Sequence, residues 1–209
     1  MNAKKRIGWV VSAVIVVGLN TGCGVTTKLQ YPLPIKDFAV KKNETIALYI
    51  PDQSKTNVWK GKININPYSV EFGNALEPNA KYALSKVFSE VVVVDKFPPP
   101  PVSAASPKRA VLIEISGANV APGAMTFSST SSSLNLKATM SQGGQIRGEP
   151  MSVQGTASAS PGVMGAIPIL GLNQLAYNKA LQKSAEGAMT KALEELVDAI
   201  IASDRNAPQ

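Results

Sequence analysis

The sequence has no histidine, a single cysteine and few aromatic residues, which make up 6% of its 209 positions. Without histidine, the chain cannot form a Ser-His-Asp triad, a Cys-His dyad or a metal site with imidazole ligands. One cysteine excludes an internal disulfide and any CxxC site. Ser-x-x-Lys and GxxxxGK[ST] motifs are also missing. We therefore expect a protein that is not an enzyme and that holds no metal and no cofactor.

Long hydrophobic runs are missing as well. The uncharged run of 13 residues from Ile7 to Leu19 is shorter than the roughly 20 residues that a membrane-spanning helix needs. It follows three basic residues at positions 4–6, and a basic start before a short apolar run is typical of a secretory signal peptide. The sequence therefore predicts an exported protein.

The five residues from Leu19 to Cys23 (Leu-Asn-Thr-Gly-Cys) resemble a bacterial lipobox. This resemblance implies that residues 1–22 are a lipoprotein signal peptide, cleaved between Gly22 and Cys23. It also implies that Cys23 carries palmitate-type acyl chains, and several such chains anchor a protein stably to a membrane. Gly24, in place of the aspartate that retains lipoproteins in the inner membrane, implies the periplasmic face of the outer membrane. The alternatives are a plain secretory signal with an incidental cysteine and an uncleaved N-terminal anchor.

Charge is moderately basic once the signal peptide is removed, with 18 basic and 14 acidic residues. A surplus of this size does not indicate a nucleic-acid partner. Seven of the basic residues fall within positions 23–62, next to the expected anchor. They are Lys28, Lys36, Lys41, Lys42, Lys55, Lys60 and Lys62. This bias would suit an anionic membrane surface, but we favour the simpler interpretation, a solvated basic tether.

The N-terminal half of the mature chain alternates between strand and helix patterns. Residues 23–43 contain two prolines and no sustained period, which predicts a lipidated, extended tether. Residues 46–50 and 61–65 read as strands, the second at a sheet edge. Apolar residues at helical spacing from Leu76 to Phe88 predict a helix that begins between Asn74 and Glu77, because Pro78 is tolerated best in a first turn. A buried strand follows at residues 91–94.

The C-terminal half predicts a hairpin and one long helix. Residues 134–140 and 151–159 alternate between apolar and polar side chains, and the intervening Gly-Gly suits a tight turn, so we expect an antiparallel hairpin after a strand at residues 110–120. A helix is predicted over residues 173–203. Its inner line is formed by Leu181, Ala185, Ala188, Ala192, Leu196 and Ile200. The small residues in this line would let the helix approach a sheet closely.

Together these patterns predict an α+β fold, a mostly antiparallel sheet with two helices packed on one face, after an N-terminal lipoprotein signal and tether. We expect a single domain over residues 44–203 and a disordered tail over residues 204–209.

Residues 161–172 are free of charged and polar side chains and are rich in glycine and proline. Such a segment could contact a membrane or a partner, or line a lipid-binding groove. The candidate contact residues are Val163, Met164, Ile167, Ile169 and Leu170. The alternative, which we favour, is an apolar crossover that packs into the core before the last helix.

The order of lipobox, strand, helix, valine-rich strand, hairpin and C-terminal helix resembles the YajG-like outer-membrane lipoproteins, and in outline the LptE-like lipoproteins of envelope assembly. The resemblance covers residues 19–202 and has Cys23 as its one specific residue. It implies a non-catalytic accessory or binding module of the cell envelope, held at the membrane through Cys23, with an envelope protein or a lipid as partner. The alternative is a lipid or glycolipid carrier or sensor that uses the apolar loop and a groove.

Overall fold

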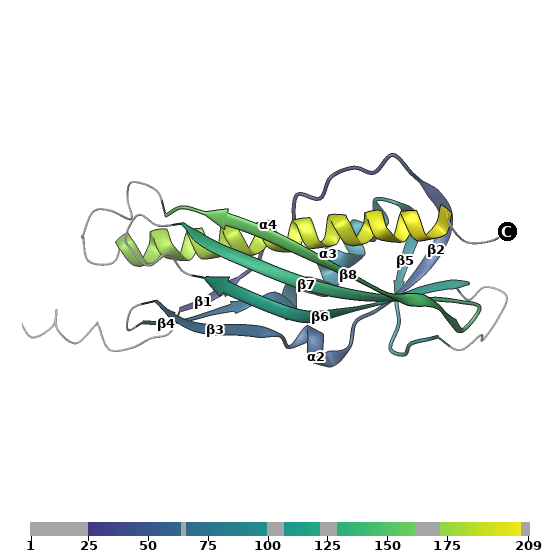
Figure 1. Ribbon diagram of the computed structural model, residues 1–209, viewed down its shortest axis with the longest axis horizontal. Helices are drawn as coiled ribbons and strands as arrows, with labels where there is room; N and C mark the ends of the chain where they lie inside the picture. The colour runs from purple at the N-terminus through teal and green to yellow at the C-terminus, as the bar shows by residue number, and fades with distance from the viewer. Residues whose placement is uncertain (1–24, 64–65, 100–106, 122–128, 162–171, 206–209) are drawn as a thin grey trace, which may run out of the picture.

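The computed structural model describes residues 25–63, 66–99, 107–121, 129–161 and 172–205, which form an elongated molecule with two sheets (Figure 1). The larger sheet has the order β5-β2-β6-β7-β8 and the smaller one β1-β4-β3. The strands are β1 (Val25–Lys28), β2 (Lys42–Tyr49), β3 (Val58–Ile63), β4 (Asn66–Glu71), β5 (Phe88–Val93), β6 (Arg109–Ala121), β7 (Thr130–Gln142) and β8 (Gln145–Ala159). The helices are α2 (Asp52–Lys55), α3 (Phe72–Ser85) and α4 (Leu172–Arg205).

The α+β class is confirmed, but the prediction of a mostly antiparallel sheet is wrong. β2 pairs in parallel with both β5 and β6, and β1 pairs in parallel with β4. Only β3–β4, β6–β7 and β7–β8 are antiparallel among the described strands. The connection from β2 to β5 includes α2, β3, β4 and α3, and a crossover this long allows the second strand to run in the same direction as the first. The second sheet and the short α2 were not predicted.

The predicted hairpin is confirmed. β7 and β8 pair from Thr130↔Ala159 to Gln142↔Gln145, and the turn residues Gly143 and Gly144 have φ angles of 59° and 80°. Positive φ at both turn positions is the signature of a tight two-residue hairpin turn, which glycine adopts without strain.

α4 packs closely on the hairpin, as the small residues predicted. All six residues of its predicted inner line have 0% exposed surface. Gly155 of β8 lies directly under the helix backbone, because a Cβ placed there would be 1.9 Å from the Ala188 carbonyl oxygen and 2.4 Å from the Ala192 nitrogen. α3 contacts α4 and β5 and contributes to the same hydrophobic core.

α3 begins earlier than predicted. It starts at Phe72, which places Pro78 in the second turn, so the expected start between Asn74 and Glu77 is wrong. Phe72 and Leu76 are both fully buried, and the burial of these side chains outweighs the one backbone hydrogen bond that proline removes. The helix ends at Ser85, and Phe88, expected on the helix, opens β5 instead.

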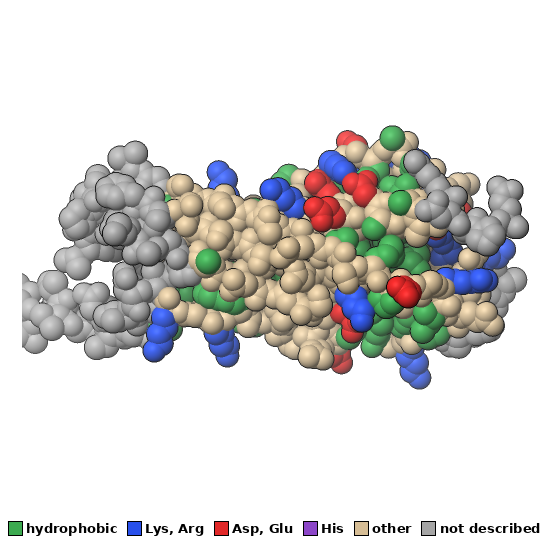
Figure 2. Space-filling model, in the orientation of Figure 1, with side chains coloured by type: hydrophobic (Ala, Val, Ile, Leu, Met, Phe, Trp, Pro, Cys, Tyr) green, Lys and Arg blue, Asp and Glu red, His purple; other side chains and the backbone are tan. Residues whose placement is uncertain are grey.

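The segment predicted as an extended tether packs against the domain. β1 pairs with β4, and Leu33, Ile35 and Phe38 are at most 7% exposed. The buried side chain of Asn79 holds this segment, because its Oδ1 accepts a 2.9 Å hydrogen bond from the Leu33 backbone N–H. The expected boundary at residue 44 therefore does not separate a tether from the domain. An ion pair between Lys36 and Asp198 also holds this segment against α4, where acidic and basic side chains lie together (Figure 2).

At the other terminus, α4 continues through Asp204 and Arg205, so the expected end of the domain at residue 203 is wrong. Residues 206–209 of the predicted tail lie outside the described residues.

Candidate membrane-facing end and binding cleft

The predicted site residues fall outside the described part of the chain. Gly22 and Cys23 precede the first described residue, Val25. Val163, Met164, Ile167, Ile169 and Leu170 lie in the segment 162–171, which is also not described. The signal peptide, the lipidation and the role of the apolar segment therefore stay predictions.

The fold does place the attachment points of both predicted segments at one end of the molecule (Figure 1). β1 starts at Val25, β8 ends at Ala159 opposite the start of β7, and α4 starts at Leu172. α4 also contacts β1 and β4 of the small sheet. The expected lipid anchor and the apolar segment are thus attached at the same end, which we call the anchor end.

The small sheet at the anchor end has one buried and one exposed face. Tyr68 and Val70 of β4 are 4% and 0% exposed and belong to the core. Residues opposite each other in a sheet share a face, so Lys60 and Lys62 of β3 lie on the other side, with Ser69 and Pro67 as their partners. Lys28 of β1 lies on that side too, opposite Glu71. Lys28, Lys60 and Lys62 are all exposed, and we call this surface the basic face.

The seven lysines near the predicted anchor therefore divide into two groups. Lys36, Lys42 and Lys55 pair with Asp198, Asp204 and Glu77, and Lys41 donates to the Lys86 carbonyl oxygen. Within the described residues, no carboxylate lies within ion-pair distance of the three lysines of the basic face. Figure 2 shows basic side chains projecting below β3. The sequence showed a basic bias but not which charges stay free.

At the opposite end, Asp204 pairs with both Lys42 and Arg109. These three side chains are only 16–18% exposed, and the Phe88 ring lies 5.8 Å from Lys42 Nζ and 5.9 Å from Arg109 Cζ. Burial lowers the pKa of Lys42 below 10.5, and the neighbouring Arg109 guanidinium lowers it further. The cluster ties the end of α4 to β2 and β6, which is a structural role.

A cleft of about 610 Å³ lies next to this cluster, between the β7–β8 hairpin and the end of α4. It is opened by a bulge, because Ala138 pairs with Met151 while Met140 pairs with Arg147, so that three residues of β8 face one residue of β7. Gly148, with a φ angle of 66°, lies within the bulge. The cleft is lined by Arg109, Met140, Ser141, Gln142, Arg147, Gly148, Glu149, Met151, Ser203 and Asp204.

The cleft has the size of a small-molecule site. Its charged side chains are two arginines and two carboxylates, so the cleft favours neither a positively nor a negatively charged ligand. Sequence reasoning missed it. The signal was Gly148 and Pro150 within an otherwise alternating strand, since these residues in a strand often mark a bulge.

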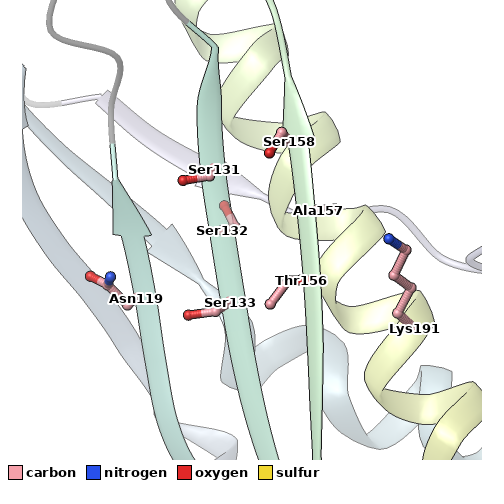
Figure 3. A pocket seen from close by; sticks show the side chains of 8 residues that line it. All are labelled: Asn119, Ser131, Ser132, Ser133, Thr156, Ala157, Ser158 and Lys191. Atoms are coloured by element: carbon pink, nitrogen blue, oxygen red, sulfur yellow. The ribbon is translucent and has the colours of Figure 1, made fainter.

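A second hollow, of about 280 Å³, lies on the sheet near the anchor end (Figure 3). Hydroxyl and amide side chains from three strands line it, including Asn119, Ser131, Ser133 and Ser158. Lys191 is the one charged residue in its lining, and no carboxylate is there to activate a hydroxyl. The hollow can donate and accept hydrogen bonds.

Among the described residues, no group of three or more acidic or cysteine side chains is placed to hold a metal ion. In the same part of the chain, no helix combines the length and apolar character that crossing a bilayer requires.

The fold resembles solved bacterial structures at low sequence identity. A DUF330-family protein from Xanthomonas campestris aligns with a TM-score of 0.56 and 9% identity, over 86% of this chain and 96% of that one. A minor lipoprotein from Acinetobacter baumannii aligns at a TM-score of 0.39, with 12% identity over 79% and 95% of the two chains. A lipoprotein from Neisseria meningitidis aligns at 0.29, with 10% identity over 78% and 99%. No protein-family model and no curated protein matches the sequence.

The first of these matches shows a shared fold and nothing about activity, and the TM-scores of the two lipoproteins are too low to support an argument. The resemblance to YajG-like lipoproteins is therefore a prediction that the comparisons leave unconfirmed.

Proposed function

We propose that this protein is a bacterial lipoprotein of the cell envelope, anchored through acylated Cys23 at the periplasmic face of the outer membrane. It acts there as a non-catalytic accessory or binding module. The single observation that carries this proposal is the position of Cys23, which ends a lipobox-like motif and lies two residues before the start of β1 at Val25.

The structure supports a short connection between anchor and domain. Gly24 alone separates Cys23 from β1, so the Cα atoms of Cys23 and Val25 can be no more than about 7 Å apart. A lipid on Cys23 would therefore hold the anchor end directly at the bilayer. The cleft and the hairpin turn, at the opposite end of the molecule, would face away from this membrane and toward a partner.

The filled core favours a binding module over a lipid carrier. A carrier would need a groove between helix and sheet, but α4 lies against Gly155 with no room for one further carbon atom. The line of α4 residues over the hairpin is fully buried along its described length. The carrier alternative keeps one supporting observation, the cleft with Met140 and Met151 in its lining.

The anchor is tested by replacing Cys23→Ser and following processing in cells labelled with radioactive palmitate. The wild-type chain should incorporate the label and fractionate with the outer membrane. The variant should incorporate none and accumulate as a precursor that is larger by the 22 residues of the signal peptide.

The matched control is Asn20→Leu, which brings the motif closer to the usual lipobox and should be processed at least as well as the wild type. Normal maturation of Cys23→Ser, or release of the wild-type chain with the soluble periplasmic proteins, would refute the proposed anchor.

A further inference from the structure

The basic face lies within the reach of the proposed anchor. Neighbouring strands in a sheet are about 4.8 Å apart, and β3 is the second strand from β1, so Lys60 and Lys62 lie on a strand about 10 Å from β1. Because Cys23 is at most about 7 Å from Val25, the lysines would stay close to the bilayer surface in any conformation of Gly24. A 20-residue tether would have allowed no such conclusion.

The charges of this face are available to an external partner. Lys60 and Lys62 are exposed, two residues apart on one edge strand, and therefore point to the same side. Glu71, on the same face, lies opposite Lys28 and accepts a 2.7 Å hydrogen bond from Asn74. The remaining positions are small or neutral, such as Thr26 and Ser69, whose hydroxyls form a 3.0 Å hydrogen bond with each other. The face thus carries a net positive charge.

We infer that the basic face docks on the anionic phospholipid headgroups of the leaflet that holds the acyl chains of Cys23. This inference rests on the proposed lipid anchor and adds an orientation, in which the outer side of the small sheet lies on the membrane. The membrane is the occupant that the position of the anchor selects, because a protein partner would have to enter between this face and the bilayer. Electrostatic attraction to anionic lipid acts only within about a Debye length, roughly 10 Å at 0.1 M salt, and in the docked orientation the lysines would lie within this distance of the headgroups.

Trp59 reports on this docking without any added label. It is the only tryptophan of the chain after Cys23 and it is the neighbour of Lys60 on β3. Its ring packs over Gly61 on the core side of the small sheet, so it would sense docked headgroups through the thickness of that one sheet. Lipidated protein would be reconstituted into phosphatidylcholine vesicles with or without phosphatidylglycerol. Quenching of Trp59 by a lipid with a nitroxide on its headgroup would then be compared between the two vesicle types.

We expect stronger quenching in the vesicles that contain phosphatidylglycerol, and we expect about 1 M salt to remove the difference, since it shortens the Debye length to about 3 Å. Replacing Lys60→Gln and Lys62→Gln together should lower the ratio of docked to undocked protein roughly 25-fold, about fivefold for each lysine. The matched control is Lys96→Gln with Lys108→Gln. These two lysines are also exposed, and Lys108 lies beside the hairpin turn at the opposite end, where its carbonyl oxygen accepts from Gly143.

Equal quenching of wild-type Trp59 in both vesicle types, in protein that floats with the vesicles, would overturn the docking inference and leave the anchor in place. Equal losses in the two double variants would also overturn it, because the effect would then follow net charge alone. If the wild-type protein isolated from cells carries no acyl chains, the proposed anchor and the docking inference are both overturned. Thermal unfolding of the variants, with midpoints equal to the wild type, confirms that a loss of quenching reflects docking.

Discussion

Gly155 offers the sharpest test of how α4 packs on the hairpin. Replacing Gly155→Ala adds a Cβ that would lie 1.9 Å from the Ala188 carbonyl oxygen and 2.4 Å from the Ala192 nitrogen. Both are helix backbone atoms, so no side-chain rotation relieves the overlap. Real Cβ contacts are essentially never closer than 3.0 Å, and the helix would therefore have to move away from β8 by about 1 Å.

The cost of this movement follows from packing. A gap of 0.5–1 Å forfeits roughly a quarter to a half of each van der Waals contact, and the core-facing side chains of α4 would lose contacts together. Overpacking ordinarily costs about 1–3 kcal/mol, and a backbone overlap of this size places Gly155→Ala at the upper end, about 3 kcal/mol. For a domain of this length, this loss in the free energy of unfolding lowers the thermal midpoint by roughly 6–12 °C.

Gly117→Ala is the matched control, since Gly117 is also a strand glycine. The three atoms nearest to its added Cβ all belong to the side chain of Asn135, the closest being Nδ2 at 3.2 Å. Because alanine also restricts the unfolded chain, we expect a change within about 1 kcal/mol. The assay is unfolding of residues 24–209 by heat and by urea, monitored by circular dichroism. These residues include every described element. Midpoints that agree for the two variants would show that the close approach of α4 to β8 does not occur.

Two further predictions test the N-terminal segment. Leu33→Ala should lower the free energy of unfolding by about 2–5 kcal/mol because Leu33 is 2% exposed, whereas Leu175→Ala, at a site 53% exposed, should cost less than about 0.5 kcal/mol; equal values would mean that the segment is a free tether after all. The pKa of Asp37 lies below its ordinary 3.8, because Lys86 Nζ donates a 2.9 Å hydrogen bond to it, so the pair stabilises the fold above about pH 3.8 and this contribution is lost as the pH falls through the lowered pKa. Lys86→Gln should return that pKa toward 3.8 in a carboxyl NMR titration, and an unchanged pKa would assign the shift to another group.

The sequence by itself determined the local elements, because their signals come from residues close together in the chain. Alternation of apolar and polar residues around Gly143 and Gly144 predicted the β7–β8 hairpin, and the spacing from Leu181 to Ile200 predicted the buried line of α4. The motif that ends at Cys23 likewise predicts the anchor from five neighbouring residues.

Only the tertiary structure decided which elements are neighbours, because those contacts join residues far apart in the chain. The apolar run within β2 is the same whether its partners run parallel or antiparallel, so it could not predict the parallel pairing with β5 and β6. The segment around Leu33 has no period of its own and is ordered by Asn79, 46 positions later. The basic face arises in the same way: Lys36 is neutralised by Asp198 on α4, whereas Lys60 is left free on an edge strand, and the sequence near these two lysines contains nothing that distinguishes them.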